Sequence, residues 1–557
     1  MRLQFLPYNP SKDSYDLDQT TDESPQQHAA RVYHRKAKLL RKAARNSQPL
    51  ATSSTVNPNS YTDAAGNKEG PNHGRGRGAP AKVGTLLPGP VTVLGAGRID
   101  PFDAYCTSNH TLMVHEMLDH AISCQWTLFA PDDKPSSLVM AKQAVMDTAI
   151  RFPVCFHTLV YSGATHKAFH QAHTVNNTKS ALLRLKSKGE ALKALRMASQ
   201  SNETALTDAV IFSMTLLTVL GYGEKVNSRM VTRYEKRTMA AQQDAQFYGS
   251  MEYEWNHWKA LIEIVKMKGG LHTIGIPGLG FAIASFDIHT AIMFQTKPAF
   301  PLFMPSSLIV CSWPTSQPGS RASQRSPTLA TGFDFLRDRG ISEALDLSNV
   351  LHGVRDLTLA FDSFQAGDPE APPIKMIIFA RNLNQHELLT LPDLSEELCS
   401  KDLTYTSNPV PRALALYEIC RLCTFVFQMT VLLPNLHSNK DVTIPYARRI
   451  RTCLETAVFK LRLQEDPACH DLLLWATLMT TWLAQGTELF GWFFDFLVDH
   501  ISVSQLLWAS DYTHNTSQWP LVQKIPAQFL WLESECEAPC AAIWKAAEAL
   551  QVQRGDE

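Results

Sequence analysis

The sequence has almost no excess of charge of either sign: 52 Lys and Arg face 53 Asp and Glu, for a formal net charge of -1 at pH 7. A protein that binds nucleic acid over its whole surface carries a strong basic excess, so this composition excludes that class. Any function that depends on charge must therefore be local to a segment. The 557 residues, 45% of them hydrophobic, suffice for several domains or one large helical assembly.

The sequence also lacks cysteines at framework spacing and apolar runs long enough to span a bilayer. The 11 cysteines are an odd number without framework spacing, which is typical of a reducing compartment. The two most apolar stretches, 209–222 and 472–486, are shorter than the roughly 20 residues that a bilayer span needs. The first residues lack the long apolar run of a secretory signal. We therefore expect a soluble, intracellular protein without a membrane partner.

Alternating strand patterns are rare, and the best candidate strand is the short stretch 375–380. Helical periodicity dominates from residue 91 onward. The expected helices cover residues 112–129, 137–151, 178–199, 203–220, 251–268, 278–294, 335–351, 412–433, 445–464, 471–499 and 537–552. The pattern predicts an all-α fold in which residues 91–557 form one large multi-helix domain, interrupted by a disordered Ser/Pro-rich loop at 312–332.

Two further regions precede this domain. Residues 1–46 form an N-terminal arm that is first acidic and then basic, and residues 47–90 are rich in Ser, Asn, Gly and Pro, which predicts a disordered linker. Within the arm, Ser24, Pro25 and Gln27 suit the cap, first and third positions of a helix over 24–46. This helix carries seven cations suited to phosphate groups or an acidic import receptor. They are Arg31, Arg35, Lys36, Lys38, Arg41, Lys42 and Arg45.

Motifs that point to catalysis fail on inspection. The stretch VTVLGAGRID at 91–100 resembles a dinucleotide loop, but Asp100 stands where the third glycine is needed. In HEMLDH at 115–120 the two histidines are five residues apart, so a helix turns them away from each other, and a surface helix is expected. Cys420 and Cys423 form a single CxxC in an apolar run, which favours buried cysteines. We therefore expect no enzyme and no cofactor.

Three histidines are the weak metal candidates. His166, His170 and His173 are spaced by four and then three residues, which places them on one face of a helix. An i, i+4 histidine pair can chelate a metal, but the sequence identifies no carboxylate or fourth ligand. A solvated histidine face is the alternative. Because the first cysteine is Cys106, we expect no cysteine-based zinc cluster before the helical domain and no stoichiometric zinc.

Several blocks together resemble fungal transcription-factor-like proteins. The N-terminal arm is similar to the start of such proteins, and LGAGRIDPFDAY at 94–105 resembles the block that opens their conserved region. HWKALIEIVKMKGGLHTIG, with the later Asp287, looks like their central helix ending in a Gly-Gly turn. The stretch 472–494 resembles their later Leu-Trp and Trp-Phe block. Many such regulators carry an N-terminal zinc binuclear cluster of six cysteines, which this sequence lacks before Cys106.

The resemblance implies a nuclear regulator of transcription in fungi, acting on a metabolic or secondary-metabolite gene set through a helical regulatory or dimerisation domain. The partners it implies are a nuclear import receptor, other proteins of the transcription machinery, a second copy of the chain, and the DNA phosphate backbone through weak contacts from the basic helix. One alternative is an interaction or scaffold protein, derived from such a regulator, that touches no DNA. The other is an enzyme whose site is assembled from distant residues.

Overall fold

The computed structural model describes Tyr105 and most of the chain from Thr111 to Asp556. The gaps are residues 131, 133, 172–177, 222, 225–243, 304–312, 339–341, 396–397, 399–408, 433–439, 464–466 and 508–517. Internal contacts divide the chain into Met1–Pro88 and Gly89–Glu557. The basic arm, the linker and residues 94–104 of the family-like block lie outside the described residues.

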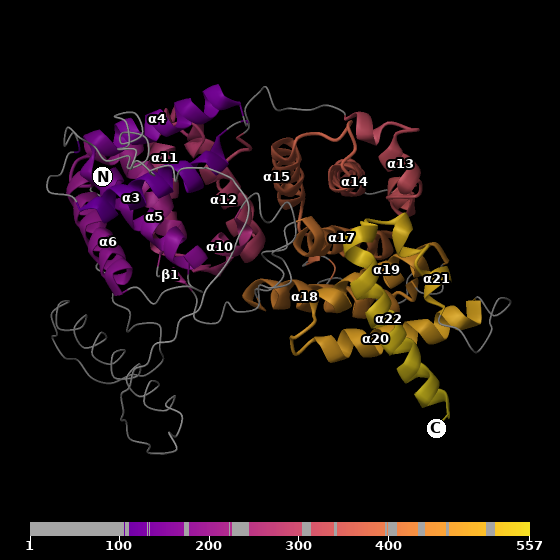
Figure 1. Ribbon diagram of the computed structural model, residues 1–557. Coiled ribbons are helices and arrows are strands. Elements are labelled where there is room, and N and C mark those ends of the chain that lie inside the picture. Colours follow the sequence, from indigo (N-terminus) through magenta and orange to yellow (C-terminus); the bar gives the residue numbers. More distant parts are fainter. Residues whose placement is uncertain are drawn as a thin grey trace, which may run out of the picture. The chain divides into compact units, whose positions relative to one another are not determined.

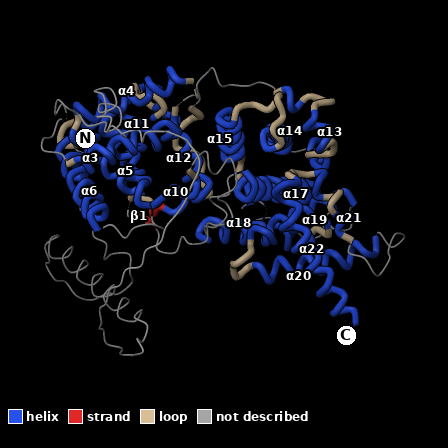
Figure 2. Tube along the Cα trace, viewed as in Figure 1, coloured by secondary structure: helices blue, strands red, loops and turns tan. Residues whose placement is uncertain are grey.

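The described part of Gly89–Glu557 is all-α, as the sequence predicts (Figures 1 and 2). Its one sheet consists of two antiparallel strands of two residues each, β1 (Gly223–Glu224) and β2 (Met251–Glu252). Since so short a ladder buries little surface, helix packing forms the core. Two groups of buried apolar side chains provide that core.

The first group lies among the indigo to magenta helices of Figure 1. These helices are α3 (Leu112–His120), α4 (Pro135–Arg151), α5 (Pro153–Gln171), α6 (Thr178–Ala198), α8 (Asp208–Val219), α10 (Ala245–Ser250), α11 (Trp255–Lys268) and α12 (Leu279–Phe294). Every residue of α8 from Ala209 to Val219 is buried, so this helix is enclosed on all sides. Gly163 of α5 lies so close to α3 that an added Cβ would overlap the carbonyl oxygen of Met117.

The second group lies among the later helices, coloured brown to yellow in Figure 1. These are α14 (Ser342–Gln365), α15 (Ile374–Thr390), α17 (Pro409–Phe427), α18 (Lys440–Glu455), α19 (Pro467–Leu483), α20 (Phe490–Leu507) and α22 (Glu533–Asp556). Trp475 of α19 is fully buried, stacks on Phe529 at 5.4 Å, and donates Nε1–H to the carbonyl of Leu530 at 3.1 Å. This bond satisfies the indole donor inside an apolar core.

The structure corrects several predictions about elements. The candidate strand 375–380 lies within α15, and the expected helix 335–351 is replaced by α14, which begins and ends later. The expected helix 471–499 is two helices, α19 and α20, because Gly486 adopts φ 77° between them. Residues 313–338 are ordered short helices rather than a disordered loop, and Trp313, Ala322 and Phe333 anchor them in the core.

The predicted end of the helix at 251–268 is confirmed. Helix α11 ends at Lys268, and Gly269 follows with φ 109°, a left-handed conformation that glycine adopts without steric cost. The amide of Gly270 donates to the carbonyl of Val265 at 2.8 Å. The Gly-Gly pair therefore reverses the chain, which continues into α12.

Val410–Leu432 is a run of 23 residues that is long and apolar enough to cross a bilayer by composition. All of its most apolar window is buried inside the helical body, as expected for the core helix of a globular fold. It also carries the charged pair Glu418 and Arg421 on one face, and these two side chains bond to each other.

Candidate functional site

A cavity of about 460 Å³ lies where α12 meets α15, within the range typical of small-molecule sites. The two helices are joined beside it by a T-shaped contact of Phe281 with Phe379, whose ring centroids are 4.4 Å apart. Asn382 Nδ2 of α15 also donates to Ser285 Oγ of α12 at 2.9 Å. The remaining wall comes from the short helix η2 (Trp126–Phe129), α4, α8 and α10.

The cavity wall is mostly apolar, and its large side chains are aromatic. The main apolar contributors are Trp126, Phe129, Leu216, Phe281, Phe286 and Phe379. Trp126 is held by a T-shaped contact with Phe212 of α8 at 4.7 Å, and Phe286 by one with Trp258 at 5.0 Å. These contacts fix the rings, so an apolar ligand would meet a preformed surface.

Donor groups are concentrated on this wall. The Nε1–H of Trp126 and the Nε2 amide of Gln385 are buried and have no hydrogen-bond partner within the described part of the chain. Their residues are only 3% and 1% exposed. A buried donor without a partner costs about 1–3 kcal/mol.

The charged groups on the wall are cationic. Lys142, Lys375 and Arg381 line it, and among the described lining residues none is Asp or Glu. Arg381 is 3% exposed and donates Nη2–H to Asn382 Oδ1 at 3.0 Å. Burial lowers the pKa of Arg381 to about 9, which leaves its guanidinium charged at neutral pH. The cavity therefore favours a ligand with an apolar body and a negatively charged or acceptor-rich head.

Two tyrosines and a histidine form the polar end of the wall. Tyr253 donates its hydroxyl to the carbonyl of Tyr248 at 2.8 Å and lies 3.3 Å from His289 Nε2. Burial raises the pKa of both tyrosines well above the usual value, so both hydroxyls stay protonated at neutral pH. They add hydrogen-bonding capacity without adding charge.

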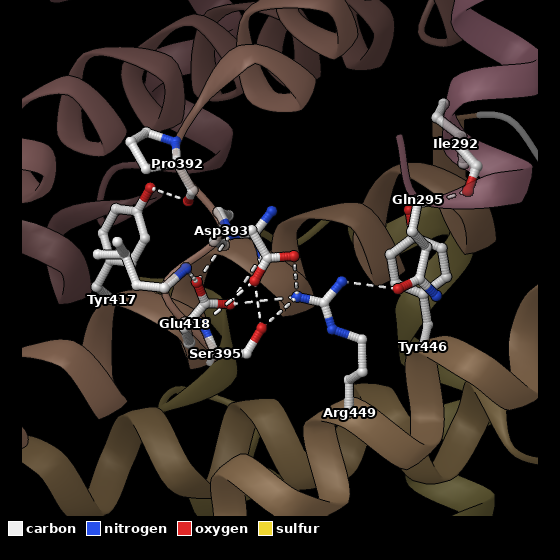
Figure 3. A network of polar contacts seen from close by, with 11 residues as sticks. Ile292, Gln295, Pro392, Asp393, Ser395, Tyr417, Glu418, Tyr446 and Arg449 are labelled. Carbon is white, nitrogen blue, oxygen red and sulfur yellow. Dashed lines mark hydrogen bonds and ion pairs between the residues drawn. The ribbon is translucent and has the colours of Figure 1, made fainter. Parts of the chain in front are cut away.

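A polar network ties the C-terminal end of α12 to α17 and α18 (Figure 3). Arg449 Nη1 donates to Gln295 Oε1 at 2.7 Å, and Arg449 Nη2 donates to Asp393 Oδ2 at 2.7 Å. Glu418 is fully buried, and its Oε1 accepts a hydrogen bond of 2.6 Å from the backbone amide of Leu394. Figure 3 shows Arg449 between Asp393 and Gln295, so one guanidinium holds the chain after α15 against α12.

A histidine cluster lies at the C-terminal half of α5. His166 and His170 both face Asp244, at 2.6 Å and 3.1 Å from its Oδ2. His120 of α3 shares a hydrogen bond of 2.8 Å with His166 Nδ1. The structure therefore brings together two of the three predicted histidines, while His173 lies outside the described residues. The sequence did not identify Asp244 or His120 as their partners.

The structure describes some of the other candidate residues and not others. The seven basic residues of the arm lie outside the described residues. Cys420 and Cys423 are fully buried in the core, as expected from their apolar surroundings. The expectation of a surface helix at 115–120 is wrong for His115, Met117 and Leu118, which are buried because α5 packs against α3.

Comparison with protein-family models, curated proteins and solved structures finds no match to the chain.

The residues of the cavity carry weak sequence signals. Trp126 lies at the end of a helical run, and Lys375, Arg381 and Gln385 lie in α15, whose first residues have the alternating pattern of a strand. A helical wheel over residues 374–390 would have placed Arg381 and Gln385 on one face, four residues apart. Nothing in the sequence shows that this face meets α12.

Proposed function

We propose that this protein is a regulator whose helical body binds a small apolar acid in the cavity between α12 and α15. The observation that carries the proposal is the combination, in one cavity, of aromatic walls, unpaired buried donors and cations. An apolar body would contact Phe281, Phe286 and Phe379, and an acid head would accept hydrogen bonds from Arg381 and Gln385. Such charge-assisted bonds are about twice as strong as neutral ones.

The proposed regulation is of transcription in a fungal nucleus. Two features support a role in transcription: the basic arm, and the sequence blocks that resemble fungal transcription-factor-like proteins. A large all-α body is the architecture that this resemblance implies. Ligand binding at the α12–α15 contact would then favour one arrangement of these helices, because a ligand shifts an equilibrium only through contacts that differ between states. The proposal assigns the helical body a binding role rather than a catalytic one.

The experiment uses the full chain and the fluorescent aromatic sulfonate 1-anilinonaphthalene-8-sulfonate, with dodecanoate and dodecanol as competitors. We expect both competitors to displace the probe, and dodecanoate to do so at lower concentration because only it carries a charge for Arg381. Ala282→Phe places a ring in the cavity and should abolish displaceable probe binding. Arg381→Met should remove the advantage of dodecanoate, whereas Arg196→Met, at an exposed position on α6, should leave it unchanged.

Probe binding that persists in Ala282→Phe would place the probe elsewhere and contradict the proposed site. Melting curves of each variant verify that the fold is retained. The nuclear part of the proposal is tested separately, by the chromatin occupancy of a tagged chain with and without residues 24–46. Absence of occupancy in both would favour the interaction-protein alternative, and it would leave the cavity result intact.

A further inference from the structure

The cluster of His166, His170 and Asp244 joins two helices that are far apart in the sequence. His166 and His170 are one turn apart on α5, so their rings lie on the same face of the helix. Asp244 precedes α10 and adopts φ 47°, a left-handed conformation that turns the chain into the helix. One ligand atom from each of the three residues lies within 4.8 Å of the other two.

We propose that His166 Nε2, His170 Nε2 and a carboxylate oxygen of Asp244 bind a divalent first-row transition-metal ion such as Zn²⁺. Two imidazoles and one carboxylate are a common ligand set for such ions in proteins. Ligand atoms about 2.0–2.2 Å from zinc lie about 3.3 Å from one another in a tetrahedron. The present separations of 2.6 Å and 3.1 Å from Asp244 Oδ2 therefore need only a small opening of the cluster.

His120 would orient the buried ligand. Metal-binding histidines almost always use their second ring nitrogen in a hydrogen bond, which fixes the ring and its tautomer. His166 has this bond already, because its Nδ1 lies 2.8 Å from His120 Nε2. His120 Nε2 is thus placed to accept the Nδ1–H bond of a metal-bound His166.

The cluster is buried on one side and open on the other. The side chains of His166 and Asp244 are 9% and 13% exposed, whereas that of His170 is 42% exposed. Phe247 of α10 closes the buried side, at 4.8 Å from the His166 ring. The nearby cation Lys167 is paired with Glu116, which reduces its repulsion of a bound metal. A fourth ligand would be water on the open side, as in zinc sites with three protein ligands.

The site differs from a metal centre built from cysteines, and it replaces the expectation of no stoichiometric zinc that the cysteine positions suggested. It also stands apart from the cavity between α12 and α15. It rests on side chains of α5 and the start of α10, and the proposed effector function can fail without affecting it.

The test uses the full chain, stripped with EDTA, dialysed, and titrated with ZnCl₂ in a calorimeter. Co²⁺ serves as a second probe, because its visible absorption reports tetrahedral nitrogen and oxygen ligation. We expect one equivalent of tight binding and a rise in melting temperature with Zn²⁺, since a ligand that binds only the native state stabilises it. His120→Leu should weaken binding by about 10–100-fold, and His120→Gln, which keeps an acceptor, should restore most of it.

His170→Ala and Asp244→Asn should weaken binding more than His120→Leu, because each removes a direct ligand. The side chain of His170 is partly exposed, so this variant should keep the melting temperature of the EDTA-treated wild type. His272→Gln changes an exposed histidine outside the cluster and should bind Zn²⁺ like the wild type. Absence of stoichiometric binding, or binding that survives both His170→Ala and Asp244→Asn, would overturn the proposal and leave a hydrogen-bonded His–Asp cluster without metal.

Discussion

Glu418 and Arg421 lie one helical turn apart on α17 and form an ion pair shielded from solvent. Arg421 Nη2 donates to Glu418 Oε2 at 2.9 Å, and the two side chains are 6% and 0% exposed, respectively. Arg449 adds a second cation 3.7 Å from the same oxygen. The carboxylate is thus satisfied by two guanidiniums and the Leu394 amide, which a buried charge requires.

We predict that Arg421→Met lowers the free energy of unfolding by about 3–5 kcal/mol, because it leaves Glu418 buried with weaker compensation. Chemical denaturation measures this change. Arg448→Met is the matched control, since Arg448 pairs with Glu488 on the surface with both side chains more than half exposed. Its expected cost is below about 1 kcal/mol. Equal effects of the two substitutions would contradict the burial argument.

Gly163 provides a second stability test. An alanine Cβ here would overlap the carbonyl oxygen of Met117 and lie 3.2 Å from Ala121 Cβ, so α5 and α3 must separate. Gly163→Ala should destabilise the protein by about 1–3 kcal/mol or more. Gly189→Ala lies within α6 with nothing near its Cβ, and it should stabilise by about 0.5–1 kcal/mol through helix propensity. Thermal melting that shows the same sign for both would refute the close approach of α3 and α5.

The reactivity of the cysteines should follow burial. Burial raises the pKa of Cys423 to about 12, so only about 1 in 10⁴ of its thiols is ionised at pH 8. Cys420 is also shifted well upward by burial and by the neighbouring cysteines. Iodoacetamide at pH 8 should label the exposed Cys124 and leave Cys420 and Cys423 unmodified, and raising the pH to 9.5 should not change this.

Peptide mapping by mass spectrometry measures the labelling at each cysteine. A sample in guanidinium chloride is the control, and there all three residues should react. Labelling of Cys423 in the native protein at the rate of Cys124 would mean that the α17 core opens readily.

The basic helix predicted over 24–46 limits how DNA can be bound. Its seven cations neutralise at most seven phosphates, so the slope of log affinity against log salt should be no steeper than about -6 for duplex DNA. Phosphate contacts carry little sequence information, so two unrelated duplexes should bind alike. Replacing all seven cations by glutamine should abolish binding. Tight binding to one duplex at high salt, or after deletion of residues 24–46, would show that another part of the chain reads DNA.

Local patterns in the sequence determined most of the helices. The apolar face of residues 251–268 and the glycines after it predicted α11 and its end, because helix periodicity and left-handed glycine caps depend only on neighbouring residues. The same reasoning failed at 375–380, where a short apolar run satisfies both the strand and the helix pattern. Periodicity also predicted one helix over 471–499 where the structure has α19 and α20, because apolar residues continue on both sides of Gly486.

Spacing on one helix likewise predicted that His166 and His170 share a face, since an i, i+4 relation is a property of the helix alone. Only the tertiary structure decided what that face meets. His120 is 46 residues before His166, and Asp244 is 74 residues after His170. The cavity arose in the same way, because Trp126, Ser285 and Gln385 come from three distant segments. Contacts between distant segments depend on how whole helices pack, and this packing is a sum over many weak apolar contacts that no local pattern records.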